Sequence, residues 1–231
     1  MTRHRVRAWF VTGTDTGVGK TWISAGIMRK LGAHGLRTSG MKPVASGASG
    51  PIGALRNEDA RMILDQCTTP QPYEDVNPCV YTEPVAPHVA AEREGVSVAL
   101  DGIVAAFGRL CRGADAVVVE GVGGWRVPLS RDLQTVDLVR ALDIPVIVVV
   151  GLRLGCINHA LLTLETLRAD GLSPCGWIAN RIDADYLYPE ATLDYLRPAL
   201  AAPLLGVVPS LERFDADRIA AAIRLDPLLS R

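Results

Sequence analysis

The sequence has little of what marks a nucleic-acid-binding or membrane-spanning protein. Aromatic residues make up 5% of the 231 residues, and the formal net charge is −1. Because this charge implies no strongly basic face, we expect no nucleic-acid partner. The apolar run at residues 144–150 is too short to cross a bilayer, and no apolar stretch of a signal peptide follows the basic residues near the start. We therefore expect a cytoplasmic protein without a membrane partner.

Cysteine pairs with the spacing of a metal site are missing as well. The cysteines are odd in number, and none forms a C-x-x-C pair, so the sequence suggests neither a disulfide framework nor a zinc site. We expect all of them to be reduced, and most of them to be small core residues. They are Cys67, Cys79, Cys111, Cys156 and Cys175.

What the sequence does contain is an alternation of short apolar segments with longer segments of helical pattern. Expected strands cover residues 7–12, 38–42, 116–120, 145–150, 176–179 and 204–208. Expected helices cover residues 20–34, 57–66, 100–112, 135–142, 158–170, 190–200 and 215–224. This order predicts an α/β fold with one doubly wound, mostly parallel sheet flanked by helices. We expect a single α/β domain over residues 1–231, with the proline-rich stretch 68–87 as an ordered excursion at the sheet edge.

The most informative segment is the glycine-rich run at residues 13–21, which ends in Gly19-Lys20-Thr21. It lies between an expected strand and an expected helix, and the free N–H groups at a helix start bind phosphate. Lys20 can then reach the β- and γ-phosphates, and the Thr21 hydroxyl can contact Mg²⁺. This pattern is that of a P-loop, with one difference. The first glycine of the motif stands one residue early, at Gly13, and Thr14 occupies the usual position of that glycine. A plain connecting turn is the alternative, but such a turn needs no Lys-Thr pair.

Two carboxylates are placed to hold a metal ion beside the phosphates. Glu120 ends an apolar strand and precedes a glycine-rich stretch, as the second acidic element of P-loop proteins does. Asp59 lies at the start of an expected helix, where stabilisation of the helix N-terminus is the simpler interpretation. Together with Thr21, the two acids offer the oxygen ligands that Mg²⁺ prefers.

Lys42 ends the second expected strand, and Pro43 prevents a helix from following it. A lysine at this edge faces the P-loop and can stabilise charge that develops on a transferred phosphoryl group. An exposed surface lysine is the alternative.

Asn180 ends the fifth expected strand, and its side-chain amide can read the edge of a base. The segment 180–183 also resembles the guanine-reading motif of GTPases, although no Asp-x-x-Gly follows the acidic strand. A turn-forming asparagine is a further interpretation. The segment 151–159 opens another helix, where free N–H groups can bind a carboxylate and Asn158 can serve as N-cap.

These segments together resemble the dethiobiotin synthetase family, over about residues 11–209. The resemblance is carried by residues 11–21, 42–47, 119–125, 154–160 and 202–206. The element Lys-Pro-Val-Ala-Ser-Gly at 42–47 is specific, because P-loop proteins in general lack it. The early first glycine is also the family's form.

The resemblance implies an ATP- and Mg²⁺-dependent ligase of biotin biosynthesis. It would close the cyclic urea of dethiobiotin from 7,8-diaminononanoate and CO₂, through a carbamate and a carbamic–phosphoric anhydride. Lys20 and Lys42 would stabilise the carbamate and the phosphoryl group, and Thr21, Asp59 and Glu120 would bind Mg²⁺. The implied ATP contacts are Gly17, Val18, Gly19, Lys20, Thr21, Asp59, Glu120, Gly121, Gly123, Asn180, Arg181, Val208, Pro209 and Ser210.

The resemblance also implies a homodimer that shares its substrate sites. Residues implied to contact the diamine are Thr16, Ser46, Gly155, Cys156 and Asn158, of which the last three would reach the partner's substrate carboxylate. A tyrosine near that carboxylate is expected too, and the candidates are Tyr186, Tyr188 and Tyr195.

The sequence departs from the family at two positions. Gly17 stands where some members have glutamate, and Ser210 stands where we expect an aromatic residue, so stacking on the base is in doubt there. Two other functions remain open at this point. One is an ATP-switched regulatory or partitioning protein of the same fold, although Asp15 occupies the place where such proteins carry a lysine. The other is a related ligase that acts on a different carboxylate or diamine.

Overall fold

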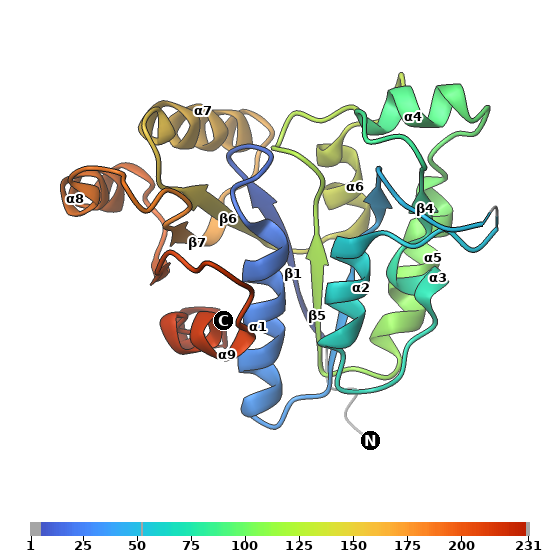
Figure 1. Cartoon of the computed structure of the whole chain (residues 1–231), viewed down its shortest axis with the longest axis horizontal. Coiled ribbons are helices and arrows are strands. Elements are labelled where there is room, and N and C mark those ends of the chain that lie inside the picture. Colours follow the sequence, from blue (N-terminus) through green and yellow to red (C-terminus); the bar gives the residue numbers. More distant parts are fainter. Residues whose placement is uncertain (1–5, 52, 230–231) are drawn as a thin grey trace.

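A computed structural model describes residues 6–51 and 53–229 of the chain. Its centre is a six-stranded sheet in the order β2-β5-β1-β6-β7-β8, and every pairing in it is parallel (Figure 1). The strands are β1 (Arg7–Gly13), β2 (Thr38–Met41), β5 (Ala116–Glu120), β6 (Val146–Gly151), β7 (Pro174–Asn180) and β8 (Leu204–Val208). The predicted doubly wound, mostly parallel sheet is confirmed.

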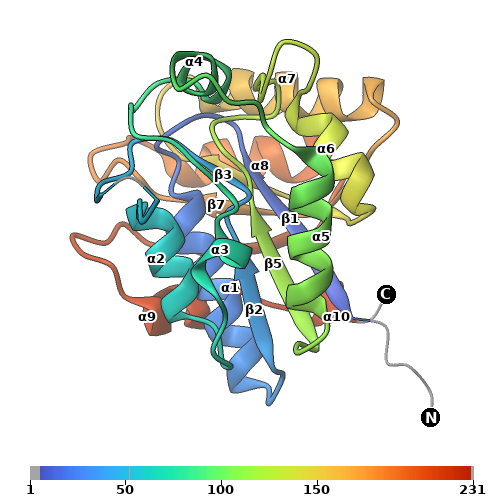
Figure 2. The same cartoon turned by 90° about the vertical axis from the view of Figure 1, so that its right-hand side faces the viewer.

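Helices cover both faces of this sheet. They are α1 (Lys20–Ala33), α2 (Glu58–Asp65), α3 (Tyr73–Val76), α4 (Pro87–Arg93), α5 (Leu100–Cys111), α6 (Thr135–Leu142), α7 (Cys156–Ala169), α8 (Pro189–Ala199), α9 (Ala216–Ala222) and α10 (Asp226–Leu229). Figure 2 shows α1, α2 and α9 on one side of the sheet and α5 and α6 on the other. Among the described residues, no helix combines the length and the apolar character needed to cross a membrane.

The strands form because they are short, rich in valine and isoleucine, and covered on both faces. All five residues of β5 and all six of β6 are buried, as expected for the centre of a parallel sheet. The chain runs from β1 outward to β2, returns to β5 and then crosses to β6, so its direction of winding reverses beside β1. In sheets of this type, ligands bind outside the carboxyl ends of the strands at such a reversal.

Most predicted elements are confirmed within one or two residues, and β5, β8 and α6 match the predicted bounds. Helix α7 differs in its start. It begins at Cys156 because Gly155, with a φ of 92°, takes the N-cap position that we assigned to Asn158. Gly35 and Gly171, which follow the ends of α1 and α7, have positive φ, as is common directly after a helix.

The sequence prediction missed a small second element of the fold near residues 44–87. Strands β3 (Val44–Ala45) and β4 (Cys79–Val80) pair in parallel as a two-stranded sheet, and α3 lies between them in the chain. The expectation about cysteines holds in part. None of the five forms a disulfide, but only Cys156 and Cys175 are fully buried, because the other three lie at the edges of the core.

Candidate functional site

The P-loop connects the carboxyl end of β1 to the start of α1. Gly19 precedes the helix with a φ of 87°, a left-handed conformation that favours glycine. A Cβ on Gly19 would lie 2.2 Å from Nδ2 of Asn180, so any larger residue would also clash. The Lys20 ammonium donates a hydrogen bond to the Asp15 carbonyl oxygen at 2.9 Å. The loop thus curls around Lys20 and leaves the helix N-terminus facing the cavity, an arrangement suited to phosphate.

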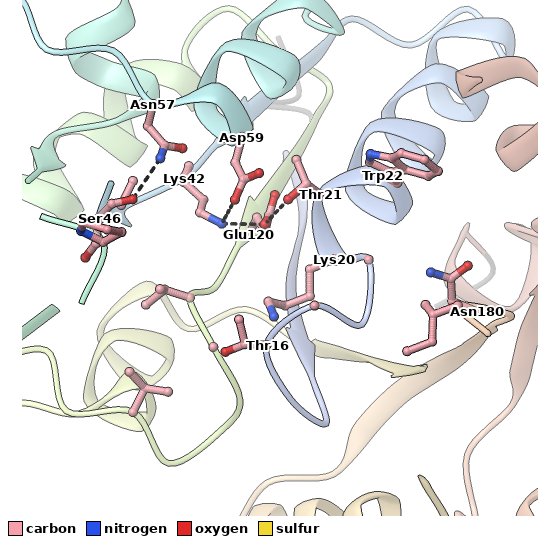
Figure 3. A pocket seen from close by; sticks show the side chains of 18 of the residues that line it. Thr16, Lys20, Thr21, Trp22, Lys42, Ser46, Asn57, Asp59, Glu120 and Asn180 are labelled. Carbon is pink, nitrogen blue, oxygen red and sulfur yellow. Dashed lines mark hydrogen bonds and ion pairs between the residues drawn. The ribbon is translucent and has the colours of Figure 1, made fainter. Parts of the chain in front are cut away.

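Side chains from four different segments converge beside this loop (Figure 3). The Lys42 ammonium lies 2.6 Å from Oε1 of Glu120 and 3.0 Å from Oδ2 of Asp59. The Thr21 hydroxyl donates to the same Oε1 of Glu120 at 2.8 Å. Lys42 is 4% exposed, which contradicts the alternative of a surface lysine. The strand ends predicted to meet at one edge of the sheet therefore do so.

Burial and neighbouring charges act in opposite directions on the pKa values of these groups. Burial lowers the pKa of Lys20 to about 8. Burial also acts to lower the pKa of Lys42, but the adjacent carboxylates of Glu120 and Asp59 outweigh it and raise that pKa. Lys42 is therefore a stable cation across the physiological pH range. The chain contains only three lysines, at positions 20, 30 and 42, and two of them lie in this site.

The oxygen atoms at this point fit a magnesium ion. The Oε2 atom of Glu120 is buried and has no hydrogen-bond partner among the described residues. With the Asp59 carboxylate and the Thr21 hydroxyl, it makes a set of hard oxygen donors. Among the described residues, no group of three or more His, Cys, Asp or Glu side chains is arranged to hold a metal ion. Mg²⁺ needs no such cluster, because it binds through one or two carboxylates together with substrate phosphates and water.

A cavity of about 900 Å³ extends from this cluster in two directions. One end reaches Asn180 and the segment after β8, and the other reaches Ser46 and the segment before α4. The sequence-predicted residues that line it are Thr16, Gly17, Gly19, Lys20, Thr21, Lys42, Ser46, Asp59, Glu120, Gly123, Asn180, Arg181, Pro209 and Ser210. Both ends of the cavity offer polar as well as apolar side chains.

Other predicted residues lie outside the surface of this cavity. Val18 and Val208 are 1% exposed and support it from beneath. Gly155, Cys156 and Asn158 stand at the start of α7, away from the cavity lining. Their segment is nevertheless tied to the P-loop, because the neighbouring Arg153 pairs with the Asp15 carboxylate. Cys156 is 2% exposed, so its thiol faces the core.

Asn180 lies at the junction of the P-loop and the far end of the cavity. Its Nδ2 atom donates to the Val18 carbonyl oxygen at 3.0 Å and so fixes the P-loop. The adjacent Arg181 pairs with Glu190, and its backbone N–H donates to the Val208 carbonyl oxygen at 3.0 Å. The amide of Asn180 is therefore not a simple turn former, since it joins β7 to the loop around the phosphates.

Sequence reasoning missed several residues of the cavity. Trp22 follows Thr21 directly and was treated as an ordinary helix residue, although its position one residue beyond the phosphate-binding pair was a usable signal. The segment 84–87 was noted only for its prolines. Asn57 was taken as the first residue of α2, but it is the N-cap of that helix and accepts from the Ala60 N–H at 3.2 Å.

A buried chain of hydrogen bonds positions the groups around Lys42. The Tyr73 hydroxyl accepts from the Asn57 backbone N–H at 2.8 Å and donates to Oδ1 of Asn77 at 2.9 Å. Asn77 in turn donates to the Lys42 carbonyl oxygen at 2.7 Å, and Asn57 donates to the Ser46 carbonyl oxygen at 3.1 Å. The Tyr73 side chain thus links the end of β2, next to Lys42, to helix α2, which carries Asp59.

Removal of this hydroxyl tests its structural contribution. Tyr73→Phe is expected to lower the free energy of unfolding by about 1–3 kcal/mol, because it leaves two buried polar groups without a partner. Urea denaturation followed by circular dichroism measures the change. Tyr81→Phe is the matched control, because Tyr81 is 3% exposed and stands outside this chain of bonds. Equal losses in the two variants would contradict a special role for Tyr73.

Comparison with known proteins places the chain among sequences of similar length. Residues 7–218 match the family described as an AAA domain. The ATP-dependent dethiobiotin synthetase BioD of Aromatoleum aromaticum is 48% identical, over 95% of this chain and 97% of that protein. The protein of the same name in Pseudomonas aeruginosa is 46% identical, over 96% of this chain and 97% of that protein. The one in Cellvibrio japonicus is 45% identical, over 96% of this chain and 98% of that protein.

Solved structures resemble the fold at much lower sequence identity. The MinD cell division protein of Aquifex aeolicus has a TM-score of 0.57 and 16% identity, over 95% of this chain and 89% of that one. The signal recognition particle 54 kDa protein of Aeropyrum pernix, solved with GDP, has a TM-score of 0.53 and 14% identity, over 92% of this chain and 43% of that one. At these identities the likeness concerns the fold alone.

Proposed function

The chain belongs to the ATP-dependent dethiobiotin synthetase family, and from this membership we propose that it closes the cyclic urea of dethiobiotin from 7,8-diaminononanoate and CO₂. It is an ATP-dependent ligase of biotin biosynthesis with a P-loop fold. The observation that carries the proposal is the convergence of Lys42, Asp59 and Glu120 beside the P-loop, at the centre of a cavity with two ends. One end suits a nucleotide and the other a small substrate.

The proposed reaction begins when one amine of the substrate bonds to the carbon of CO₂ and loses a proton, which gives a carbamate. A carbamate oxygen then attacks the γ-phosphorus of ATP, and the bond to the bridging oxygen breaks as ADP leaves. The second amine attacks the carbonyl carbon of the mixed anhydride and loses a proton. The carbon–oxygen bond to phosphate breaks in that step, and the ring closes as phosphate leaves.

The protein contributes charge and position to this sequence. Lys20 and Lys42 flank the point where the γ-phosphoryl group passes to the carbamate, so their charges stabilise the oxygens that gain negative charge. Thr21, Asp59 and Glu120 would hold Mg²⁺, which offsets charge on the β- and γ-phosphates when bound. Thr16 and Ser46 would contact the diamine end. The backbone around Gly17, Val18, Gly19, Gly121 and Gly123 would surround the phosphates, with Asn180, Arg181, Val208, Pro209 and Ser210 at the base.

Mass spectrometry of the product tests this function. The protein is mixed with ATP, Mg²⁺, bicarbonate and the diamine, and the expected product has the mass of the cyclic urea. ATP turnover should require both the diamine and bicarbonate. Turnover of ATP at full rate without them, or a product of another mass, would contradict the proposal and favour a regulatory ATPase or a ligase for another substrate.

The proposal includes one domain over residues 1–231 and a homodimer. Large apolar side chains are exposed on α7, on α8 and on the loops before them, which lie side by side in the fold (Figure 1). They are Leu154, Leu162, Leu187, Tyr188 and Tyr195, with exposures of 90%, 52%, 74%, 80% and 53%. Exposed apolar side chains gathered in one region mark interaction surfaces. Gly155 and Asn158 lie within this region, as a shared substrate site requires.

A charged side chain introduced on this surface is expected to dissociate the proposed dimer. Leu162→Arg should convert a dimer to a monomer, because an unpaired charge would be buried at the interface. Sedimentation velocity measures the mass in solution. Val96→Arg is the matched control, since Val96 is also 52% exposed but stands between α4 and α5. A wild-type chain that sediments as a monomer at micromolar concentration would contradict the dimer.

A further inference from the structure

We propose that Trp22 forms the wall of the nucleobase subsite, on which the base of the nucleotide stacks. This inference rests on the proposed function, and it adds a residue to which neither the motif nor the comparisons assign a role. Trp22 is the third residue of α1, directly after the lysine and threonine of the P-loop. A nucleotide whose phosphates lie at the start of this helix therefore has its sugar and base near this side chain.

Trp22 lies at one of the two ends of the cavity, opposite the end proposed for the diamine. Figure 3 shows Trp22 and Asn180 on one side of the P-loop and Ser46 and Asn57 on the opposite side. The lining around Trp22 comes from the ends of β7 and β8, with Arg181 and the segment 209–211. The phosphate-binding residues lie between the two ends, so a triphosphate that spans them leaves its base beside Trp22.

The indole ring is held in place from the side of α9. Its ring centroid lies 5.8 Å from that of Phe214, with an angle of 59° between the planes, which is a favourable tilted arrangement. Helices α1 and α9 pack closely beneath it, since a Cβ on Gly26 would come within 2.2 Å of the Ile219 side chain. A ring fixed before the ligand arrives loses little freedom on binding.

The chemistry of this end of the cavity matches a flat aromatic base. Among the described residues that line the cavity, Trp22 alone carries an aromatic ring. Ser210 and Pro209, on the opposite segment, are exposed and offer no aromatic face. The Asn180 amide supplies a polar group at the same end of the cavity. An aromatic face and an amide in one subsite are the combination that stacks a base and reads its hydrogen-bonding groups.

Tryptophan fluorescence can report on Trp22 separately, because the other tryptophans are buried away from a ligand in the cavity. Trp9, Trp125 and Trp177 are 3%, 3% and 1% exposed and lie in the core. Binding of ATP with Mg²⁺ is therefore expected to change tryptophan emission in the wild type, through contact of the base with Trp22. The change should disappear in Trp22→Phe, which keeps a ring, while calorimetry still detects binding of ATP.

Calorimetry on a second variant gives the decisive test. Trp22→Leu is expected to weaken ATP binding about tenfold, the order of one base–aromatic stack. Inorganic triphosphate with Mg²⁺ carries no base and should bind wild type and Trp22→Leu equally. Trp22→Phe should restore most of the affinity for ATP.

Two results would overturn the inference. One is an unchanged affinity of Trp22→Leu for ATP, and the other is an equal loss for ATP and for inorganic triphosphate, which would show damage to the P-loop helix. Failure of the proposed function gives a different result, because ATP would then bind with the expected dependence on Trp22 while no cyclic urea forms.

Discussion

Replacement of Lys42 by alanine is expected to lower kcat for ring closure by on the order of 10²-fold or more, the loss typical of a single electrostatic donor in an active site. Lys42 is 4% exposed and lies within 3.0 Å of two carboxylates, beside the helix that would bind the triphosphate. The effect falls on kcat because the oxygens that gain negative charge do so during phosphoryl transfer.

Product formation over time by mass spectrometry measures this effect. Circular dichroism and ATP calorimetry on the same variant show whether it remains folded and still binds ATP. Lys30→Ala is the matched control, since Lys30 is the remaining lysine of the chain and lies at the far end of α1. Ring closure at a near-normal rate by Lys42→Ala would remove Lys42 from the mechanism.

Replacement of Glu120 by glutamine is expected to lower the free energy of unfolding by about 3 kcal/mol, because it breaks a buried ion pair on one side only. The side chain of Glu120 is fully buried, with 0% exposure, and that of Lys42 is 5% exposed. The variant keeps the shape of the side chain but leaves the ammonium with Asp59, whose side chain is 47% exposed. Ligase activity should fall as well, because a proposed ligand of Mg²⁺ is lost.

A double variant separates stability from function at this pair. Lys42→Met combined with Glu120→Gln removes both charges and should recover most of the lost stability, since a buried ion pair is often replaced by neutral groups at little cost. The double variant should remain inactive. Urea denaturation of the wild type, the single variants and the double variant gives the four values needed. Strictly additive losses would contradict a direct interaction between the two side chains.

The centre of this site could be predicted from the sequence because its residues stand at the ends of parallel strands. Lys42 directly follows β2, Glu120 ends the neighbouring β5, and the P-loop follows β1, the next strand of the sheet. A parallel sheet brings the carboxyl ends of these strands to one edge, regardless of the conformation of the loops that follow them. Apolar segments that alternate with helices were enough to predict that sheet, since burial on both faces leaves a clear pattern.

The parts that could not be predicted depend on contacts distant in sequence. Strands β3 and β4 have two residues each and form only because their partners meet, so no local pattern marks them. The link from Tyr73 to Asn57 joins residues 16 apart through a side chain. Helix α7 begins at Cys156 because Gly155 adopts a left-handed conformation at the N-cap. The sequence prediction placed the N-cap at Asn158, because asparagine is a common N-cap residue. Trp22 was missed because a partly buried tryptophan is also common in helix packing, although its position directly after Lys20 and Thr21 was a usable signal.

Transfer of oxygen from bicarbonate to phosphate tests the central claim most directly, because it reports the bond that forms between the carbamate and the γ-phosphoryl group. The protein is supplied with ¹⁸O-labelled bicarbonate, ATP, Mg²⁺ and the diamine, and the reaction is stopped before the bicarbonate has exchanged its label with water. The released phosphate is then analysed by mass spectrometry. We predict one labelled oxygen in each phosphate released with ring closure. Phosphate without label, formed together with the cyclic urea, would show that the carbamate is never phosphorylated and would contradict the mechanism.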